Sequence, residues 1–91
     1  MPRRDLSLVE QENVRSLIRV LRSRFGNWVS VERALPISHG MRVDVMAGRH
    51  EVSAAIAFRV AKAFEVSLYD VIAGTALPPG TCKHCGRPSA G

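Results

Sequence analysis

The 91-residue chain contains only two cysteines, only two lysines and no long apolar run. Because Cys82 and Cys85 form a single Cys-x-x-Cys, a framework of several disulfides is excluded. No segment reaches the ~18 consecutive apolar residues of a transmembrane helix. The basic start, Met-Pro-Arg-Arg-Asp, is followed by no apolar run, so no signal peptide is predicted. We therefore expect a cytoplasmic protein without membrane contact.

Signals for β-strands and for catalysis are also missing. No stretch of alternating polar and apolar residues is long enough to indicate a strand. No nucleophile, general base and orienting group occur together, and there is no glycine-rich loop of the phosphate-binding kind. The sequence predicts one all-α domain that is not an enzyme and has no small-molecule substrate.

The charge of the chain favours a nucleic-acid partner. Thirteen Lys+Arg against eight Asp+Glu give a net charge of +5. All of these cations except Lys62 and Lys83 are arginines, whose guanidinium groups bind phosphate and guanine edges in a bidentate way. A positive charge alone is weak evidence, because many charged faces are simply solvated.

Capping residues divide the chain into five helical segments. Ser7 and Glu10 stand three residues apart, as in a capping box, and Pro36 ends a helix by restricting the residue before it. The expected N-caps are Ser7, Asn27, Ser38, Ser53 and Ser67. The expected closing glycines, which accept the left-handed conformation, are Gly26, Gly48 and Gly74. A second helix is predicted over residues 28–35 and a third over about residues 39–47.

Apolar residues at three- and four-residue steps mark the faces that these helices bury. In the first helix they are Val14, Leu17, Ile18, Leu21 and Phe25, and in the second Val31, Ala34 and Leu35. In the fourth they are Ala54, Ala57, Val60, Ala61 and Phe64, and in the fifth Leu68, Val71 and Ile72. Another face of the first helix carries Arg15, Arg19 and Arg22, which we interpret as a solvated basic face.

The second and third helices, joined by a tight turn, have the layout of a helix-turn-helix motif. The major groove admits one helix, and the preceding helix braces it across the backbone. The run Val60–Ile72 and the segment Ala34–Gly40, which closes at residues 47–49, resemble the lambda-repressor-like, Cro-type helix-turn-helix domains. The resemblance covers about residues 8–74, and it implies a five-helix fold in which the third helix reads DNA.

Three positions depart from the family pattern. Glu32 stands where the family has a small residue, Pro36 replaces the turn glycine, and Arg42 occupies an apolar position of the recognition helix. In the family these positions pack together. Either Glu32 and Arg42 form a partly buried ion pair between the helices, or the alignment is shifted by one residue. The three departures are also compatible with a motif that binds protein instead of DNA.

The resemblance places His39 and Gly40 at the start of the recognition helix, where side chains of the family reach base edges. Gly40 has no side chain and only permits a close approach. Asp44, one turn later, points to the same side. It is a candidate acceptor for the cytosine amino group, or alternatively a solvated charge or a partner for Arg42 or His50.

Other candidates concern the phosphate backbone. Arg42 is either a groove or phosphate contact or the partner of Glu32. Arg49 is either a phosphate contact or an ordinary exposed arginine. Trp28 opens the second helix, where the family contacts phosphate, and we expect it to be partly buried in packing. The complete set of candidate DNA contacts is Asn27, Trp28, Ser38, His39, Gly40, Arg42, Asp44 and Arg49.

The Cys-x-x-Cys has the spacing of half a zinc knuckle. A structural Zn²⁺ takes four ligands, and one chain supplies two thiolates, Cys82 and Cys85. A second chain would complete a four-thiolate site in a homodimer, since His84 between the cysteines is a poor third ligand to the same ion. The alternatives are a thiol pair that oxidises and a tail without a role.

The sequence thus predicts a basic arm over residues 1–6, a helix-turn-helix domain over residues 7–74, and a Pro/Gly linker with the Cys-x-x-Cys tail over residues 75–91. Arg3 and Arg4 of the arm either enter the minor groove or have no role. The predicted function is sequence-specific binding of double-stranded DNA by a small transcriptional regulator, acting as a homodimer because one recognition helix reads few base pairs. The alternative is a protein-interaction module, antitoxin-like or a regulator's partner, without base readout.

Overall fold

The computed structural model describes residues 6–77 and Gly80. This part of the chain contains five α-helices and no strand, which confirms the all-α prediction. The helices are α1 (Leu8–Phe25), α2 (Trp28–Ala34), α3 (His39–Ala47), α4 (Ala54–Phe64) and α5 (Leu68–Ala73). The predicted arm residues Arg3 and Arg4, and the cysteines of the tail, lie outside the described residues.

The helix boundaries follow the capping residues that the sequence predicted. The side chain of each expected N-cap accepts a hydrogen bond from the backbone N–H three residues later. At the start of α1 the capping box is complete, because the Glu10 carboxylate also accepts from the Ser7 N–H at 2.8 Å. Gly26, Gly48 and Gly74 close their helices with φ near +80°, a conformation that costs glycine little.

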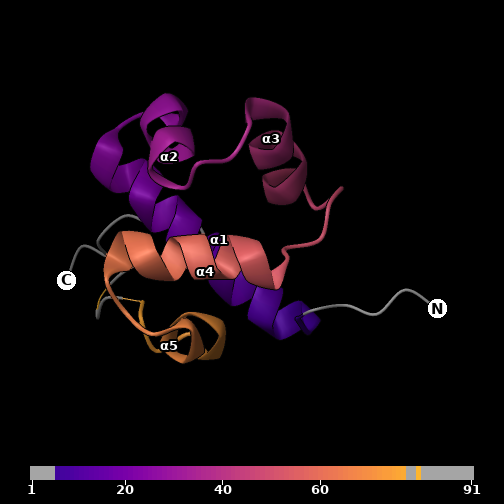
Figure 1. The fold of residues 1–91 in the computed structure, drawn as a ribbon, viewed down its shortest axis with the longest axis vertical. Coiled ribbons are helices and arrows are strands. Elements are labelled where there is room, and N and C mark those ends of the chain that lie inside the picture. Colours follow the sequence, from indigo (N-terminus) through magenta and orange to yellow (C-terminus); the bar gives the residue numbers. More distant parts are fainter. Residues whose placement is uncertain (1–5, 78–79, 81–91) are drawn as a thin grey trace.

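The long helix α1 is the centre of the packing, and α2, α4 and α5 all contact it (Figure 1). The fully buried side chains come from all five helices, from the loop between α2 and α3 and from the segment between α3 and α4. The largest are Leu17, Ile18, Leu35, Gln11, Val14, Val31, Val45, Val52, Val60 and Val71. All of them except Gln11 are apolar, so burial of apolar surface is the main stabilising contribution.

The predicted buried faces are correct except at helix ends. Phe25, the last residue of α1, is 43% exposed, and Leu68, the first residue of α5, is 36% exposed. Ala34, the last residue of α2, is exposed as well. At these ends the apolar residues continue at three- and four-residue steps, but neighbouring elements do not cover them completely. Ile56, which the prediction for α4 omitted, is buried.

The packed region extends past residues 7–74 at both ends. Leu6, assigned to the arm from the sequence, is 6% exposed and belongs to the core. Ala76 and Leu77, assigned to the linker, are partly buried against the same core. Residues from outside the periodic helices therefore help to close this small domain.

Candidate nucleic-acid interface

The candidate interface consists of α2, α3 and the loop of residues 35–38 between them. Val31 and Leu35 from α2 and the loop are fully buried, as is Val45 of α3. These three side chains attach the two short helices to the core. The backbone N–H of Ile37 donates to the Glu32 carbonyl at 3.1 Å, which keeps the connection tight. In Figure 1, α3 lies at an edge of the molecule, with one side turned away from the other helices.

Glu32 and Arg42 form an ion pair between α2 and α3. The Arg42 Nε donates to Glu32 Oε2 at 2.9 Å, and the two side chains are only 12% and 14% exposed. The pair occupies the two positions where charged residues replace small and apolar ones in the family pattern. Of the two roles predicted for Arg42, the structure places it in the internal one.

Two more side chains complete this group, which we call the α2–α3 cluster: Trp28, Glu32, His39 and Arg42. The Arg42 guanidinium lies 4.5 Å from the centroid of the Trp28 ring, within the range of a cation–π contact. The His39 Nδ1 lies 3.1 Å from Glu32 Oε2. Trp28 is half-buried and packs against the core, as predicted.

The pKa of Glu32 lies below its ordinary value of 4.5. The main cause is the hydrogen bond from Arg42, and the burial of the carboxylate opposes it. A smaller lowering comes from His39. Glu32 is therefore ionised at neutral pH and holds the charge of Arg42 inside the motif.

The remaining side chains of α3 that were predicted to reach DNA are accessible. The His39 side chain is 74% exposed, and nothing lies within 4 Å of a Cβ built on Gly40. Asp44 is 49% exposed at its side chain, and it accepts a hydrogen bond from Arg49 Nε at 3.1 Å. The partner of Asp44 is thus Arg49, and neither of the two partners suggested from the sequence, Arg42 and His50.

The side chains of Asn27 and Ser38 are engaged in capping. The Asn27 Oδ1 accepts from the Ser30 N–H at 2.8 Å, and the Ser38 Oγ accepts from the Met41 N–H at 3.1 Å. Both side chains fix the start of a helix. Any contact that they make to a ligand has to coexist with this role.

The position of α3 also depends on α1, through residues that the sequence analysis assigned differently or overlooked. Arg15 donates from Nε to the Val45 carbonyl at 2.8 Å, near the C-terminal end of α3, where a cation is favourable. Gln11 accepts from the Val52 N–H at 3.0 Å and donates to the Leu6 carbonyl at 3.2 Å. Together they hold the segment that leaves α3.

The interpretation of Arg15, Arg19 and Arg22 as a solvated face is wrong. The Arg15 side chain is 14% exposed, Arg19 pairs with Glu12 at 2.7 Å, and the Arg22 guanidinium lies 5.8 Å from the Trp28 ring. Arg15 contacts α3 and Arg22 contacts α2, while Arg19 pairs with Glu12 of the same helix. The periodicity alone did not reveal which elements lie against this face of α1.

The described residues contain no group of three or more His, Cys, Asp or Glu side chains placed to hold a metal ion. The predicted zinc ligands Cys82 and Cys85 lie outside this part of the chain. Within the same part, no helix is both long enough and apolar enough to cross a membrane.

Comparisons of the chain with protein-family models, curated proteins and solved structures found no match. The resemblance to the lambda-repressor-like domains therefore stays a prediction. The geometry of α2 and α3 and the charge of the chain are the observations that bear on its function.

Proposed function

We propose that the chain is a sequence-specific DNA-binding transcriptional regulator with a lambda-repressor-like helix-turn-helix domain, in which α3 enters the major groove. The observation that carries the proposal is the two-sided character of α3. Its inner side is fixed by the buried Val45 and by the ion pair of Arg42, while His39 and Gly40 at its start are exposed. A rigid support with an accessible helix start is what readout of base edges requires.

The exposed polar side chains of this region can make two kinds of contact, one to phosphate groups and one to base edges. Arg49, which follows the C-cap of α3, has a side chain that is 63% exposed, so it can reach a phosphate oxygen. His39 can donate to or accept from a base edge in the groove. The net charge of +5 adds a general attraction to the DNA backbone.

We further propose that the protein acts in the cytoplasm as a homodimer. One recognition helix contacts only a few base pairs, and two half-sites related by the symmetry of a dimer raise specificity. Zinc shared through Cys82 and Cys85 of two chains would stabilise this assembly, since a closed structural site needs four donors.

A protein-interaction module without base readout is the second candidate. Two ion pairs within the motif favour this candidate: Arg42 is paired with Glu32, and Asp44 is paired with Arg49. These pairs reduce the number of side chains that are free to contact bases.

Selection of bound duplexes from a random DNA pool distinguishes the two candidates. The DNA-binding proposal predicts enrichment of a sequence with two related halves. The logarithm of the association constant for that sequence falls by about 0.9 per neutralised phosphate for each tenfold rise in salt concentration. Absence of any enriched sequence, or affinity that ignores salt, would favour the interaction module.

A further inference from the structure

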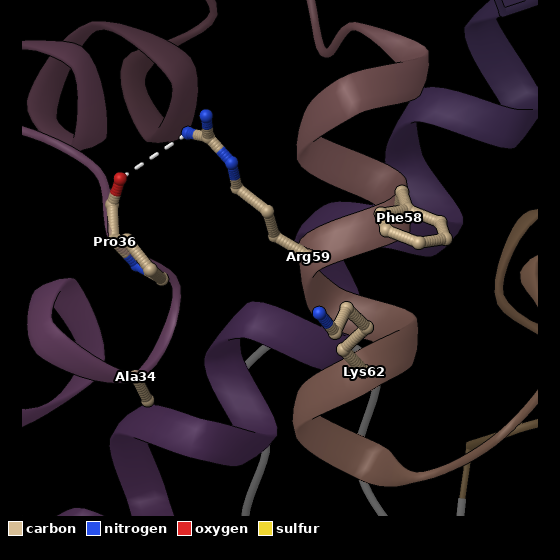
Figure 2. A pocket seen from close by; sticks show the side chains of 5 residues that line it. All are labelled: Ala34, Pro36, Phe58, Arg59 and Lys62. Atoms are coloured by element: carbon tan, nitrogen blue, oxygen red, sulfur yellow. Dashed lines mark hydrogen bonds between the residues drawn. The ribbon is translucent and has the colours of Figure 1, made fainter.

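A hollow of about 480 Å³ lies between the C-terminal part of α2 and the outer side of α4 (Figure 2). It is lined by Ala34, Pro36, Phe58, Arg59 and Lys62. Pro36 and Arg59 stand on opposite sides, joined by a hydrogen bond of 3.2 Å from Arg59 Nη1 to the Pro36 carbonyl. The hollow contains none of the candidate DNA contacts.

The walls of this hollow combine apolar surface with positive charge. Phe58 is 53% exposed on α4, and Ala34 and Pro36 are exposed on the α2 side of the hollow. Arg59 and Lys62 are one helical turn apart on α4, so their side chains are neighbours on the same face. A surface of this kind attracts a ligand that is both apolar and acidic.

The two cations of the hollow form no ion pair within the described part of the chain, unlike Arg15, Arg42 and Arg49. Arg59 donates to a neutral carbonyl, and the Lys62 Nζ lies 5.7 Å from the centroid of the Phe58 ring. The charge of both groups is therefore available to an anionic partner without breaking an internal pair.

We propose that the hollow binds an acidic peptide segment of a partner protein. One apolar side chain of the peptide lies against Ala34 and Pro36, another lies against Phe58, and two carboxylates contact Arg59 and Lys62 between them. Carboxylates suit this arrangement because they accept charge-assisted hydrogen bonds from guanidinium and ammonium groups. A DNA backbone would meet the same cations but would leave the phenyl ring of Phe58 uncovered, so a peptide accounts for both parts of the surface.

A random dodecapeptide library, selected on the immobilised full chain without DNA, tests the proposal. We expect enrichment of Asp and Glu next to Leu, Phe or Trp. For an enriched peptide, Arg59→Glu with Lys62→Glu should weaken binding by about tenfold or more, because attraction becomes repulsion. Phe58→Ala should also weaken it, since one apolar side chain of the peptide loses its contact.

The matched control is Arg24→Glu with Arg33→Glu, which changes the net charge equally at two exposed positions outside the hollow. This variant should keep most of the affinity, and far-UV circular dichroism should show that all variants are folded. Enrichment of basic peptides, enrichment of none, or an equal loss in the control would overturn the proposal. The proposal would also be overturned if Arg59→Glu with Lys62→Glu abolished DNA binding but left the affinity for the peptide unchanged. Because no DNA is present in the peptide assay, its outcome is separate from that of the DNA-binding proposal.

Discussion

Replacement of Gln11 by methionine is the sharpest test of how the domain is held together. The Gln11 side chain is 1% exposed, and it joins α1 to the Leu6 carbonyl and to the Val52 N–H. Methionine has a similar shape but makes neither hydrogen bond. A buried N–H left without a partner costs about 1–3 kcal/mol, and the lost bond to Leu6 costs about 0.5–1.5 kcal/mol.

Burial of the less polar thioether offsets part of this loss, so we expect the free energy of unfolding of Gln11→Met to fall by about 2 kcal/mol. For a domain of this size, that fall lowers the Tm by roughly 8–16 °C. Urea and thermal unfolding followed by far-UV circular dichroism measure the effect. The Val52 amide should also exchange its hydrogen faster, because its acceptor is gone.

The matched control for this change is Val9→Met, which introduces the same residue at a position of α1 that is 71% exposed. Surface substitutions of this kind change stability by no more than about 0.5 kcal/mol. A Gln11→Met variant that is as stable as the wild type would contradict the assigned role of the two Gln11 hydrogen bonds. So would a Val9→Met variant that is destabilised by the same amount.

Three more predictions concern the ion pair and the tail. In a double-mutant cycle, Glu32→Ala with Arg42→Val should be less destabilising than the sum of the single changes, because each single change leaves one charge unpaired; strict additivity in urea unfolding would show that the side chains do not interact. The lowered pKa of Glu32 means that its contribution to stability is present above its ordinary pKa of 4.5 and is lost as the pH falls through the lower pKa of the folded state. Wild-type stability should therefore decline more steeply with acid than that of Glu32→Gln, and parallel pH profiles would contradict this. Purified protein should carry about half an equivalent of zinc per chain if two chains share one ion, and Cys82→Ser should remove it; elemental analysis that finds a full equivalent points instead to a site within one chain.

The features that sequence analysis found correctly are mostly local. A cap such as Ser38 contacts an N–H three residues away, so the residue and its partner lie within one short stretch. The Glu32–Arg42 pair could also be predicted from the sequence. Its two charged residues stand at positions that pack together in the family that the sequence resembles. Its geometry confirms one of the alternatives that the pattern allowed.

The missed contacts join residues that are far apart in the chain. Gln11 contacts Val52, 41 positions later, and Arg15 contacts Val45, 30 positions later. A signal for Gln11 existed, since it lies three residues before Val14 on the buried stripe of α1, where a polar residue needs a hydrogen-bond partner. Nothing in the sequence identified that partner. The same limit explains why Arg15 was assigned to a solvated face.

We propose that the exposed start of α3 reads bases, and a comparison of the DNA sequences that three forms of the protein select tests this role. Selection from a random pool is carried out in parallel with the wild type, with His39→Ala and with Arg49→Ala. His39→Ala should relax the preference at one or two base pairs in each half-site, because its side chain reaches a base edge. Arg49→Ala should weaken binding to all sequences alike and leave the preference intact, because phosphate contacts carry no sequence information. An unchanged preference in His39→Ala would contradict this role.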